Sequence, residues 1–93
     1  MPWVYLLRCG DGSLYAGSAK DLDRRLAQHA AGRASRYTRS HRPVTLAWAR
    51  RVRTWNAALR EEARLKGLRR ADKVALIAAP APSRRRARSS RRA

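Results

Sequence analysis

The sequence predicts a small α+β domain, in which a three-stranded antiparallel sheet is flanked by helices. This prediction rests on two patterns in a chain of 93 residues, a length that suits a single domain. Runs of aromatic and branched residues typical of strands lie at 3–9, 13–17 and 44–51. Apolar residues at helical spacing lie at 21–31, 55–66 and 69–78. The order of these elements is two consecutive strands, a later third strand and helices that pack on the sheet, which is typical of an α+β fold. The sheet is too small for a doubly wound fold.

The first two strands form a β-hairpin around residues 10–12, whose Gly-Asp-Gly sequence tolerates the positive φ angles of a tight turn. The length of the turn decides where the tyrosines of the two strands lie. A three-residue loop would pair Cys9 with Ser13. Tyr5 and Tyr15 would then be diagonal neighbours on one face of the sheet. A two-residue turn would place the two rings on opposite faces, because side chains alternate along a strand.

The first helix is predicted over 21–31, and Gly32 provides its C-terminal stop. Its inner stripe is expected to consist of Leu22, Leu26 and Ala30. Arg25 and His29 lie on the adjoining flank one turn apart, so their side chains can reach the same object. The guanidinium of Arg25 matches phosphate oxygens, and His29 could donate to a phosphate or relay a proton. The alternatives are a solvated charge for Arg25 and a structural role for His29.

Residues 33–42 form a basic loop, with room for a helical turn, before the third strand at 44–51. In that strand Val44, Leu46 and Trp48 alternate with small or polar residues and are expected to share one face. The basic loop could form a nucleic-acid platform, in which guanidinium groups bind phosphates and a phenol ring stacks on an unpaired base. The platform residues are Arg33, Arg36, Tyr37, Arg39 and Arg42. The alternative is a solvated basic loop.

The second helix, predicted over 55–66, carries a carboxylate on its apolar face. With a turn of about 100° per residue, the apolar side consists of Trp55, Ala58, Leu59 and Leu65. Glu62 falls inside this stripe, whereas Glu61 points away from it. A carboxylate on an apolar face is costly unless it is paired, hydrogen-bonded or metal-bound. Glu62 is therefore either a metal ligand or the partner of Lys66 in an i,i+4 ion pair. In the last helix the predicted packing residues are Ala71, Val74, Ala75 and Ile77.

The chain is strongly basic, because 23 Lys and Arg against 6 Asp and Glu give a formal net charge of +17. Such a field attracts polyanions, so nucleic acid is the expected partner, DNA more than RNA, with salt-dependent binding. A membrane surface is not expected, because no strongly amphipathic basic helix supports it. A single cysteine, Cys9, cannot form an internal disulfide, which favours a protein of the reducing cytoplasm.

The composition changes at Pro80, which divides the chain into two predicted parts. Residues 1–79 would form the folded domain, and residues 80–93 would form a disordered, arginine-rich basic tail. The tail is expected to add non-specific affinity for nucleic acid, because its charges need no fixed conformation to attract phosphates.

Two tyrosine-containing motifs in the hairpin resemble the GIY…YIG signature of the GIY-YIG nuclease superfamily. Residues 4–6 (VYL) take the place of the first triplet, and residues 15–17 (YAG) take that of the second. The resemblance continues in three further segments, DLDRRLAQH at 21–29, RYTRSHRPV at 36–44 and ALREE at 58–62. In this order and spacing the motifs are similar to those of the small standalone bacterial YhbQ-like group.

The resemblance implies a GIY-YIG fold and an endonuclease that hydrolyses phosphodiester bonds in DNA, in repair or processing, with one Mg²⁺ or Mn²⁺ ion. Its active-site residues would be Tyr5, Tyr15, Arg25, His29 and Glu62. Glu62 would bind the metal, Arg25 would hold a phosphate oxygen, and one tyrosine, Tyr5 by preference, would position or deprotonate the attacking water. Gly17 matches the glycine of the second motif, where a side chain would crowd the site. One departure is Ala19, where the group often has threonine; another is the lack of a late asparagine.

Two other classes of function are compatible with the sequence. The chain could be a non-catalytic nucleic-acid-binding module that keeps this fold, and its binding would then need no divalent ion. It could instead be an accessory protein of RNA or of the ribosome, and it would then bind RNA tightly without affinity for DNA.

Overall fold

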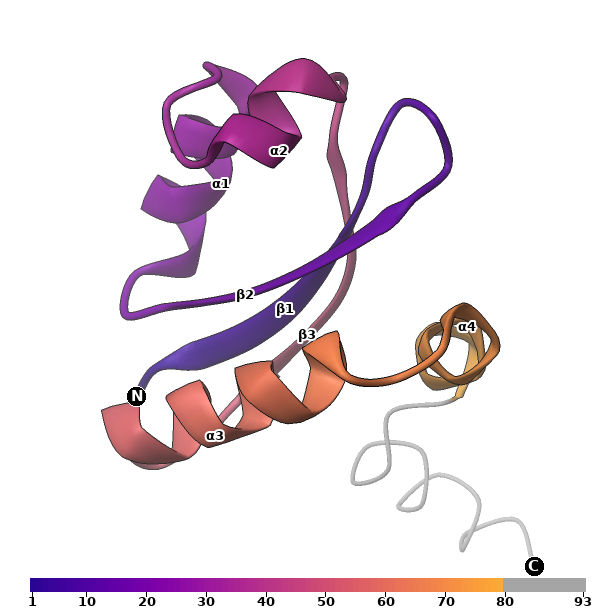
Figure 1. Ribbon diagram of the computed structural model, residues 1–93. Helices are drawn as coiled ribbons and strands as arrows, with labels where there is room; N and C mark the ends of the chain where they lie inside the picture. Colours follow the sequence, from indigo (N-terminus) through magenta and orange to yellow (C-terminus); the bar gives the residue numbers. More distant parts are fainter. Residues whose placement is uncertain (80–93) are drawn as a thin grey trace, which may run out of the picture.

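The structure combines one sheet with four helices (Figure 1). The computed structural model describes residues 1–79. In chain order the elements are β1 (Trp3–Arg8), β2 (Leu14–Ala19), α1 (Leu22–Ala30), α2 (Arg36–Ser40), β3 (Thr45–Arg51), α3 (Trp55–Lys66) and α4 (Arg70–Ala78). The strands are antiparallel in the order β2-β1-β3, which confirms the predicted α+β fold. The predicted tail at 80–93 lies outside the described residues, and no helix in residues 1–79 is long and apolar enough to cross a membrane.

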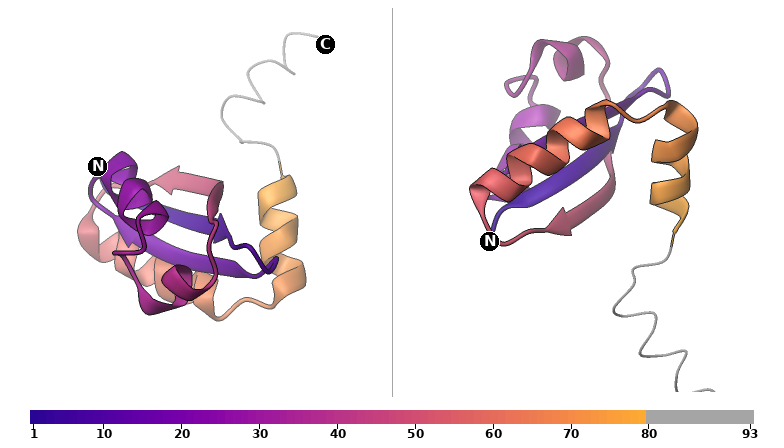
Figure 2. Two further views of the ribbon diagram at one scale, coloured as in Figure 1. Left: turned by 90° about the horizontal axis from the view of Figure 1, so that it is seen from above. Right: turned by 60° about the horizontal axis from the view of Figure 1, so that its bottom comes forward.

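The helices cover both faces of the sheet, with α1 and α2 on one face and α3 on the other (Figures 1 and 2). The core between the sheet and α3 is formed by buried Val4, Leu6, Ala16 and Leu65. The core between the sheet and α1 is formed by buried Tyr5, Leu7 and Ala19. The central strand β1 therefore contributes alternate residues to two small cores, which explains why its apolar run is continuous rather than alternating.

The hairpin has a three-residue loop, so its two tyrosines share a face. The Cys9 N–H donates to the Ser13 carbonyl over 2.9 Å. In the register that follows, Tyr5 pairs with Gly17. Tyr15 lies two residues before Gly17 and points to the same side. Of the two registers that the sequence allowed, the structure has the one that places both phenol groups on the α1 face.

A β-bulge in the pairing of β1 with β3 corrects the prediction that Val44, Leu46 and Trp48 share one face. Leu6 pairs with Trp48. The next residue of β1 pairs with Leu46, so one residue of β3 has no partner. Such a shift reverses the faces of all later residues. Trp48 therefore packs on the core under α3, Val44 packs on the core under α1, and Leu46 is 44% exposed.

His29, rather than Ala30, completes the inner side of α1. Ala30 is exposed, whereas His29 is buried and the two leucines of the stripe pack against the core. The prediction was wrong at this position because His29 and Ala30 lie seven and eight residues after Leu22. Both spacings fit an apolar helix face that starts at Leu22. The basic segment that follows contains the short helix α2, whose N-cap Ser35 accepts a hydrogen bond from the Thr38 N–H.

The last two helices bury fewer of their apolar residues than predicted. In α3 Leu59 is 44% exposed. In α4 Leu76 and Ile77 pack on the core, whereas the predicted Ala71, Val74 and Ala75 are exposed. Figure 2 shows the reason, because α4 lies beside one end of the sheet rather than across its face.

Candidate active site

Tyr5 lies directly over Gly17. A Cβ atom at Gly17 would be 2.5 Å from the Tyr5 hydroxyl oxygen and 2.6 Å from its ring carbon Cζ. Both distances are far below van der Waals contact. Only glycine therefore lets the Tyr5 ring cross β2 and bring its hydroxyl toward the outer edge of the sheet.

Gly17→Ala is expected to lower both stability and activity, because the new methyl group must push the Tyr5 ring out of place. Overpacking of this kind costs about 1–3 kcal/mol, which should appear as a lower Tm in thermal unfolding. Gly67→Ala is the matched control, because a Cβ there would be 3.6 Å from its nearest neighbour. Equal Tm values for the two variants would contradict the close contact of Tyr5 with Gly17.

The Tyr5 hydroxyl begins a buried chain of hydrogen bonds. Its oxygen lies 2.9 Å from His29 Nε2, and His29 Nδ1 lies 2.8 Å from Thr38 Oγ1. All three side chains are inaccessible to solvent, at 1%, 1% and 0% exposure. The Thr38 hydroxyl lies 2.9 Å from Ser35 Oγ and 3.4 Å from the Ser35 carbonyl, so it can donate to Ser35 and accept from Nδ1. In the tautomer that carries its proton on Nδ1, His29 Nε2 accepts the Tyr5 proton.

Burial keeps both Tyr5 and His29 neutral at pH 7. It raises the pKa of Tyr5 to about 12, and the positive charge of Arg25 opposes this shift. Burial, and after it the charge of Arg25, lowers the pKa of His29 from its ordinary value of 6.5. A neutral imidazole can accept a proton from the phenol, whereas a protonated one cannot.

The lowered pKa of His29 predicts a loss of stability in mild acid. Above pH 6.5 the imidazole is neutral in the folded and the unfolded chain; below it the unfolded chain takes up the proton first. The free energy of unfolding should therefore fall as the pH drops from 6.5 to the lower pKa of the folded state. In thermal unfolding, the loss of stability between pH 6.5 and the lower pKa should be smaller in His29→Gln than in wild type. The control His41→Gln should show the same loss as wild type. An unchanged pH dependence in His29→Gln would contradict this cause.

Arg25 reaches the same phenol from α1. Its Nε donates to Gln28 Oε1 over 3.0 Å, which orients the guanidinium within the helix. The charge of Arg25 acts on both Tyr5 and His29. The predicted flank of Arg25 and His29 is therefore part of the tyrosine site, and Arg25 is its source of positive charge.

Glu62 approaches the site from α3. Ser18 Oγ on β2 donates to its Oε1, and Lys66 Nζ lies 2.8 Å from its Oε2. The ion pair that the sequence left open is thus present. The Glu62 side chain is only 19% exposed, and its negative charge acts on Tyr5. The structure brings Tyr5, Tyr15, Arg25 and His29 together on the α1 face of the sheet, and Glu62 approaches β2 from α3 on the other face, within electrostatic reach of Tyr5.

The site offers a divalent cation a single carboxylate. Within residues 1–79 no three side chains of His, Cys, Asp or Glu come together as a metal cluster. The Lys66 ammonium beside Glu62 marks a place that favours positive charge, and its 54% exposed side chain can move away. Mg²⁺ is commonly bound by one or two carboxylates while it keeps several waters and binds substrate phosphates. Glu62 fits this pattern of ligation.

Tyr15 starts a column of aromatic rings that leads away from the site. Its ring meets His29 edge-on and stacks on Tyr37, with centroids 5.7 Å apart in both pairs. Tyr37 in turn stacks on His41 at 4.1 Å. Tyr37 therefore already stacks on two rings of the protein, although it is 39% exposed. The stacking role of Tyr37 stays a prediction.

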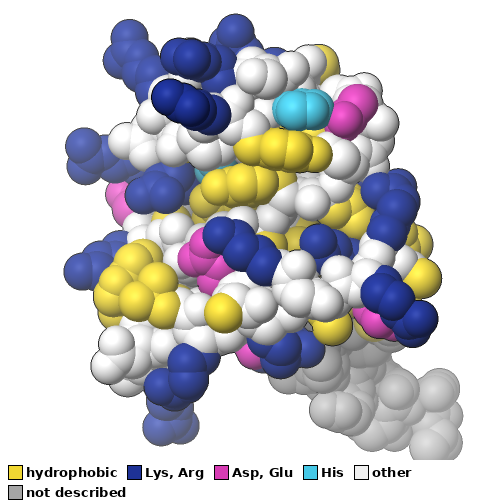
Figure 3. Space-filling view, in the orientation of Figure 1, with side chains coloured by type: hydrophobic (Ala, Val, Ile, Leu, Met, Phe, Trp, Pro, Cys, Tyr) yellow, Lys and Arg dark blue, Asp and Glu magenta, His cyan; other side chains and the backbone are white. Residues whose placement is uncertain are grey.

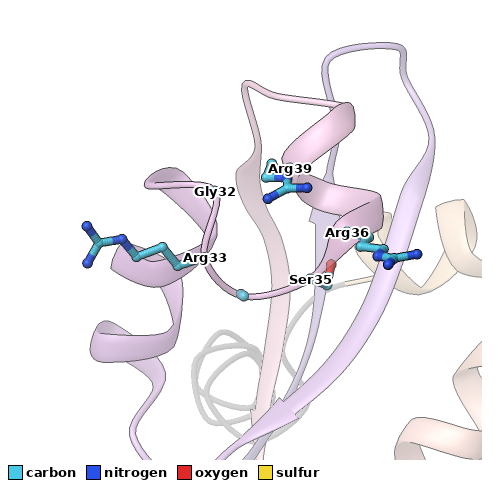
Figure 4. Close-up of a pocket in the computed structure, with 6 residues that line it drawn as sticks. Gly32, Arg33, Ser35, Arg36 and Arg39 are labelled. Carbon is cyan, nitrogen blue, oxygen red and sulfur yellow. The ribbon is translucent and has the colours of Figure 1, made fainter.

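The arginines of the predicted platform are spread around α2. A pocket of about 410 Å³ is lined by Gly32, Arg33, Ala34, Ser35, Arg36 and Arg39. Figure 4 shows Arg33 and Arg36 pointing to opposite sides of it. Arg42 lies against Gly32 and donates to the Ala30 carbonyl over 3.4 Å. Lys and Arg side chains also border the strip of hydrophobic side chains in Figure 3. This spread suits several phosphates along a backbone, and binding by these arginines stays a prediction.

Known proteins similar to this chain define its family. Residues 1–75 match the GIY-YIG catalytic domain. A UPF0213 protein of Halobacterium salinarum is 43% identical over 77 residues, which cover 83% of this chain and 100% of that protein. A UPF0213 protein of Staphylococcus saprophyticus is 39% identical over 75 residues, 81% of this chain and 92% of its own length. The chain belongs to the GIY-YIG family, whose members are typically endonucleases and generally use divalent metal ions.

A solved structure gives the same assignment at the level of the fold. The solution NMR structure of a UPF0213 protein from Bacillus halodurans has a TM-score of 0.54 and 38% sequence identity. The match covers 83% of each chain. Within the family, the relatives of this chain are UPF0213 proteins, a group of small standalone GIY-YIG proteins, which confirms the predicted superfamily and group.

Proposed function

We propose that the protein is a metal-dependent endonuclease that hydrolyses phosphodiester bonds in DNA. The observation that carries this proposal is the position of Glu62. Its carboxylate accepts a hydrogen bond from Ser18 on β2 and lies within electrostatic reach of Tyr5, although Glu62 and Tyr5 come from different elements. A fold that needed only to bind phosphates would gain nothing from a half-buried carboxylate among them.

The side chains of the site divide the requirements of hydrolysis among them. Arg25 would hold a non-bridging phosphate oxygen and balance the charge that develops on it. Tyr5 would orient the attacking water and take a proton from it, while the phenol proton of Tyr5 passes to Nε2 of His29 along the 2.9 Å hydrogen bond. Tyr15, which is only half-buried, would donate to the phosphate. Mg²⁺ or Mn²⁺ held by Glu62 would supply Lewis-acid stabilisation of the leaving oxygen.

The wider surface supports a nucleic acid as the substrate. Arg33, Arg36, Arg39 and Arg42 lie on the same side of the sheet as α1 and would contact the backbone beyond the scissile phosphate. A basic tail beyond residue 79 would add affinity that depends on salt. We place the activity in DNA repair or processing in the cytoplasm, where a reducing environment suits the lone buried Cys9.

The test is cleavage of a panel of nucleic acids by the purified protein. Labelled single-stranded, duplex and branched DNA, together with RNA, would be incubated with Mg²⁺, with Mn²⁺ and with a chelator. We expect metal-dependent cleavage of at least one DNA. Cleavage of none of these substrates would overturn the endonuclease proposal, and cleavage of RNA alone would overturn the choice of DNA.

The Lys66–Glu62 ion pair favours a second candidate, a non-catalytic nucleic-acid-binding module. In this structure the ammonium already balances the carboxylate charge, at 2.8 Å from Oε2. A binding module of this kind would show the same affinity for DNA with a divalent ion and with a chelator. For the nuclease, Mn²⁺ should bind to the protein itself, which isothermal titration calorimetry can measure without substrate.

A further inference from the structure

A second pocket lies beside the candidate active site, between α1 and the start of α3. Its volume is about 300 Å³, which falls at the lower end of small-ligand sites. Most of its lining is polar or aromatic and consists of Lys20, Asp21, Arg24, Arg25, Gln28 and Trp55. Arg25 belongs both to this pocket and to the candidate active site. A group bound in the pocket would therefore lie next to a phosphate held by Arg25.

Trp55 is the residue of this pocket that packing does not explain. It is the first residue of α3, directly after the N-cap Thr54. It is only half-buried, and it belongs to neither hydrophobic core of the described residues. Lys20 Nζ lies 5.2 Å from the centre of its ring. Such an exposed cation–π pair contributes little to stability, so the indole is available for another flat partner.

The chemistry of the pocket matches one nucleotide. A tryptophan ring offers a face on which any nucleobase can stack. Lys20, Arg24 and Arg25 outnumber the single carboxylate of Asp21, so the pocket attracts a sugar-phosphate backbone. The Lys20 ammonium that lies over the indole would pair with the incoming phosphate. The amide of Gln28 accepts from Arg25 and keeps its NH₂ group as a donor to a base edge.

We propose that this pocket binds the base of an unpaired nucleotide adjoining the scissile phosphate, stacked on Trp55. The inference rests on the proposed function, because Arg25 must hold that phosphate. It also narrows the substrate class. A base inside a duplex cannot reach a side pocket without leaving its partner, so the preferred substrate is single-stranded or locally unpaired.

The experiment compares two oligomers of equal length and charge, a fluorescein-labelled oligothymidylate and an abasic deoxyribose-phosphate oligomer without bases. Binding to wild type and to Trp55→Ala is measured by fluorescence anisotropy with a chelator present, so that nothing is cut. Wild type should bind the oligothymidylate roughly tenfold more tightly than the abasic oligomer. Trp55→Ala should lose most of this preference while its affinity for the abasic oligomer is unchanged. Trp55→Phe, which keeps a stacking ring, should restore part of it.

Trp3→Ala is the matched control, because Trp3 is also half-buried outside both cores and carries an arginine over its ring, Arg51 at 5.5 Å, but does not line this pocket. It should keep the wild-type preference, and thermal unfolding shows that both variants are folded at the assay temperature. If the preference persists in Trp55→Ala, or if wild type has none, the base pocket is overturned while the endonuclease proposal stands. Failure of wild type to bind either oligomer would overturn both.

Discussion

Replacing Glu62 by glutamine should lower the kcat of metal-dependent DNA cleavage by at least roughly a hundredfold, the scale of losing one preorganised electrostatic group. The amide keeps the size of the side chain and can still accept from Ser18. It lacks the negative charge that would hold a divalent cation. Mn²⁺ binding measured by calorimetry should weaken in parallel, whereas binding of DNA in the presence of a chelator should not.

Glu61→Gln is the control that the chain provides for this prediction. The two glutamates are neighbours on α3, and their side chains are equally accessible, at 18% and 19%. Glu61 points away from the site and pairs with Arg50 and Arg64. Its variant should therefore cut like wild type and lose some thermal stability. Wild-type cleavage by Glu62→Gln would remove the basis of the proposed nuclease.

Tyr5→Phe should lower kcat by roughly a hundredfold to ten-thousandfold, the usual contribution of a general acid or base. The change removes one oxygen, keeps the ring over Gly17 and leaves His29 Nε2 without its partner. The lost hydrogen bond should cost about 1 kcal/mol of stability. Single-turnover rates and DNA affinities, measured below the Tm of the variant, should show a slower chemical step with little change in binding.

The pH profile separates a chemical role of Tyr5 from a structural one. In wild type the cleavage rate should fall in acid as His29 gains a proton, and the lowered pKa of His29 places this fall below pH 6.5. The residual activity of Tyr5→Phe should lack this fall, because no phenol proton is then transferred. If Tyr5→Phe cuts at the wild-type rate, Tyr5 is not the base, and Tyr15 would be the tyrosine that activates the water.

Patterns between residues close in sequence were enough to predict the strands and three of the helices, and the resemblance to the GIY-YIG superfamily added the five proposed catalytic residues. The Gly-Asp-Gly turn located the hairpin, and the angle of Glu62 on its helix marked it as an unusual carboxylate. The short helix α2 was expected only as room for a turn in a basic loop. The helix is only five residues long, and its N-cap is Ser35, whose side chain accepts a hydrogen bond from the Thr38 N–H.

Tertiary packing decided which partners these residues meet. The hydrogen bond of Tyr5 with His29 joins residues 24 positions apart, and that of Ser18 with Glu62 joins residues 44 apart. A helical or strand period defines the face on which a side chain lies, but it does not define what covers that face. His29 and Ala30 both fit the inner side of α1, and only contact with the sheet selected His29. The bulge in β3 likewise became evident only through pairing with β1, because an extra residue is defined by the strand opposite it.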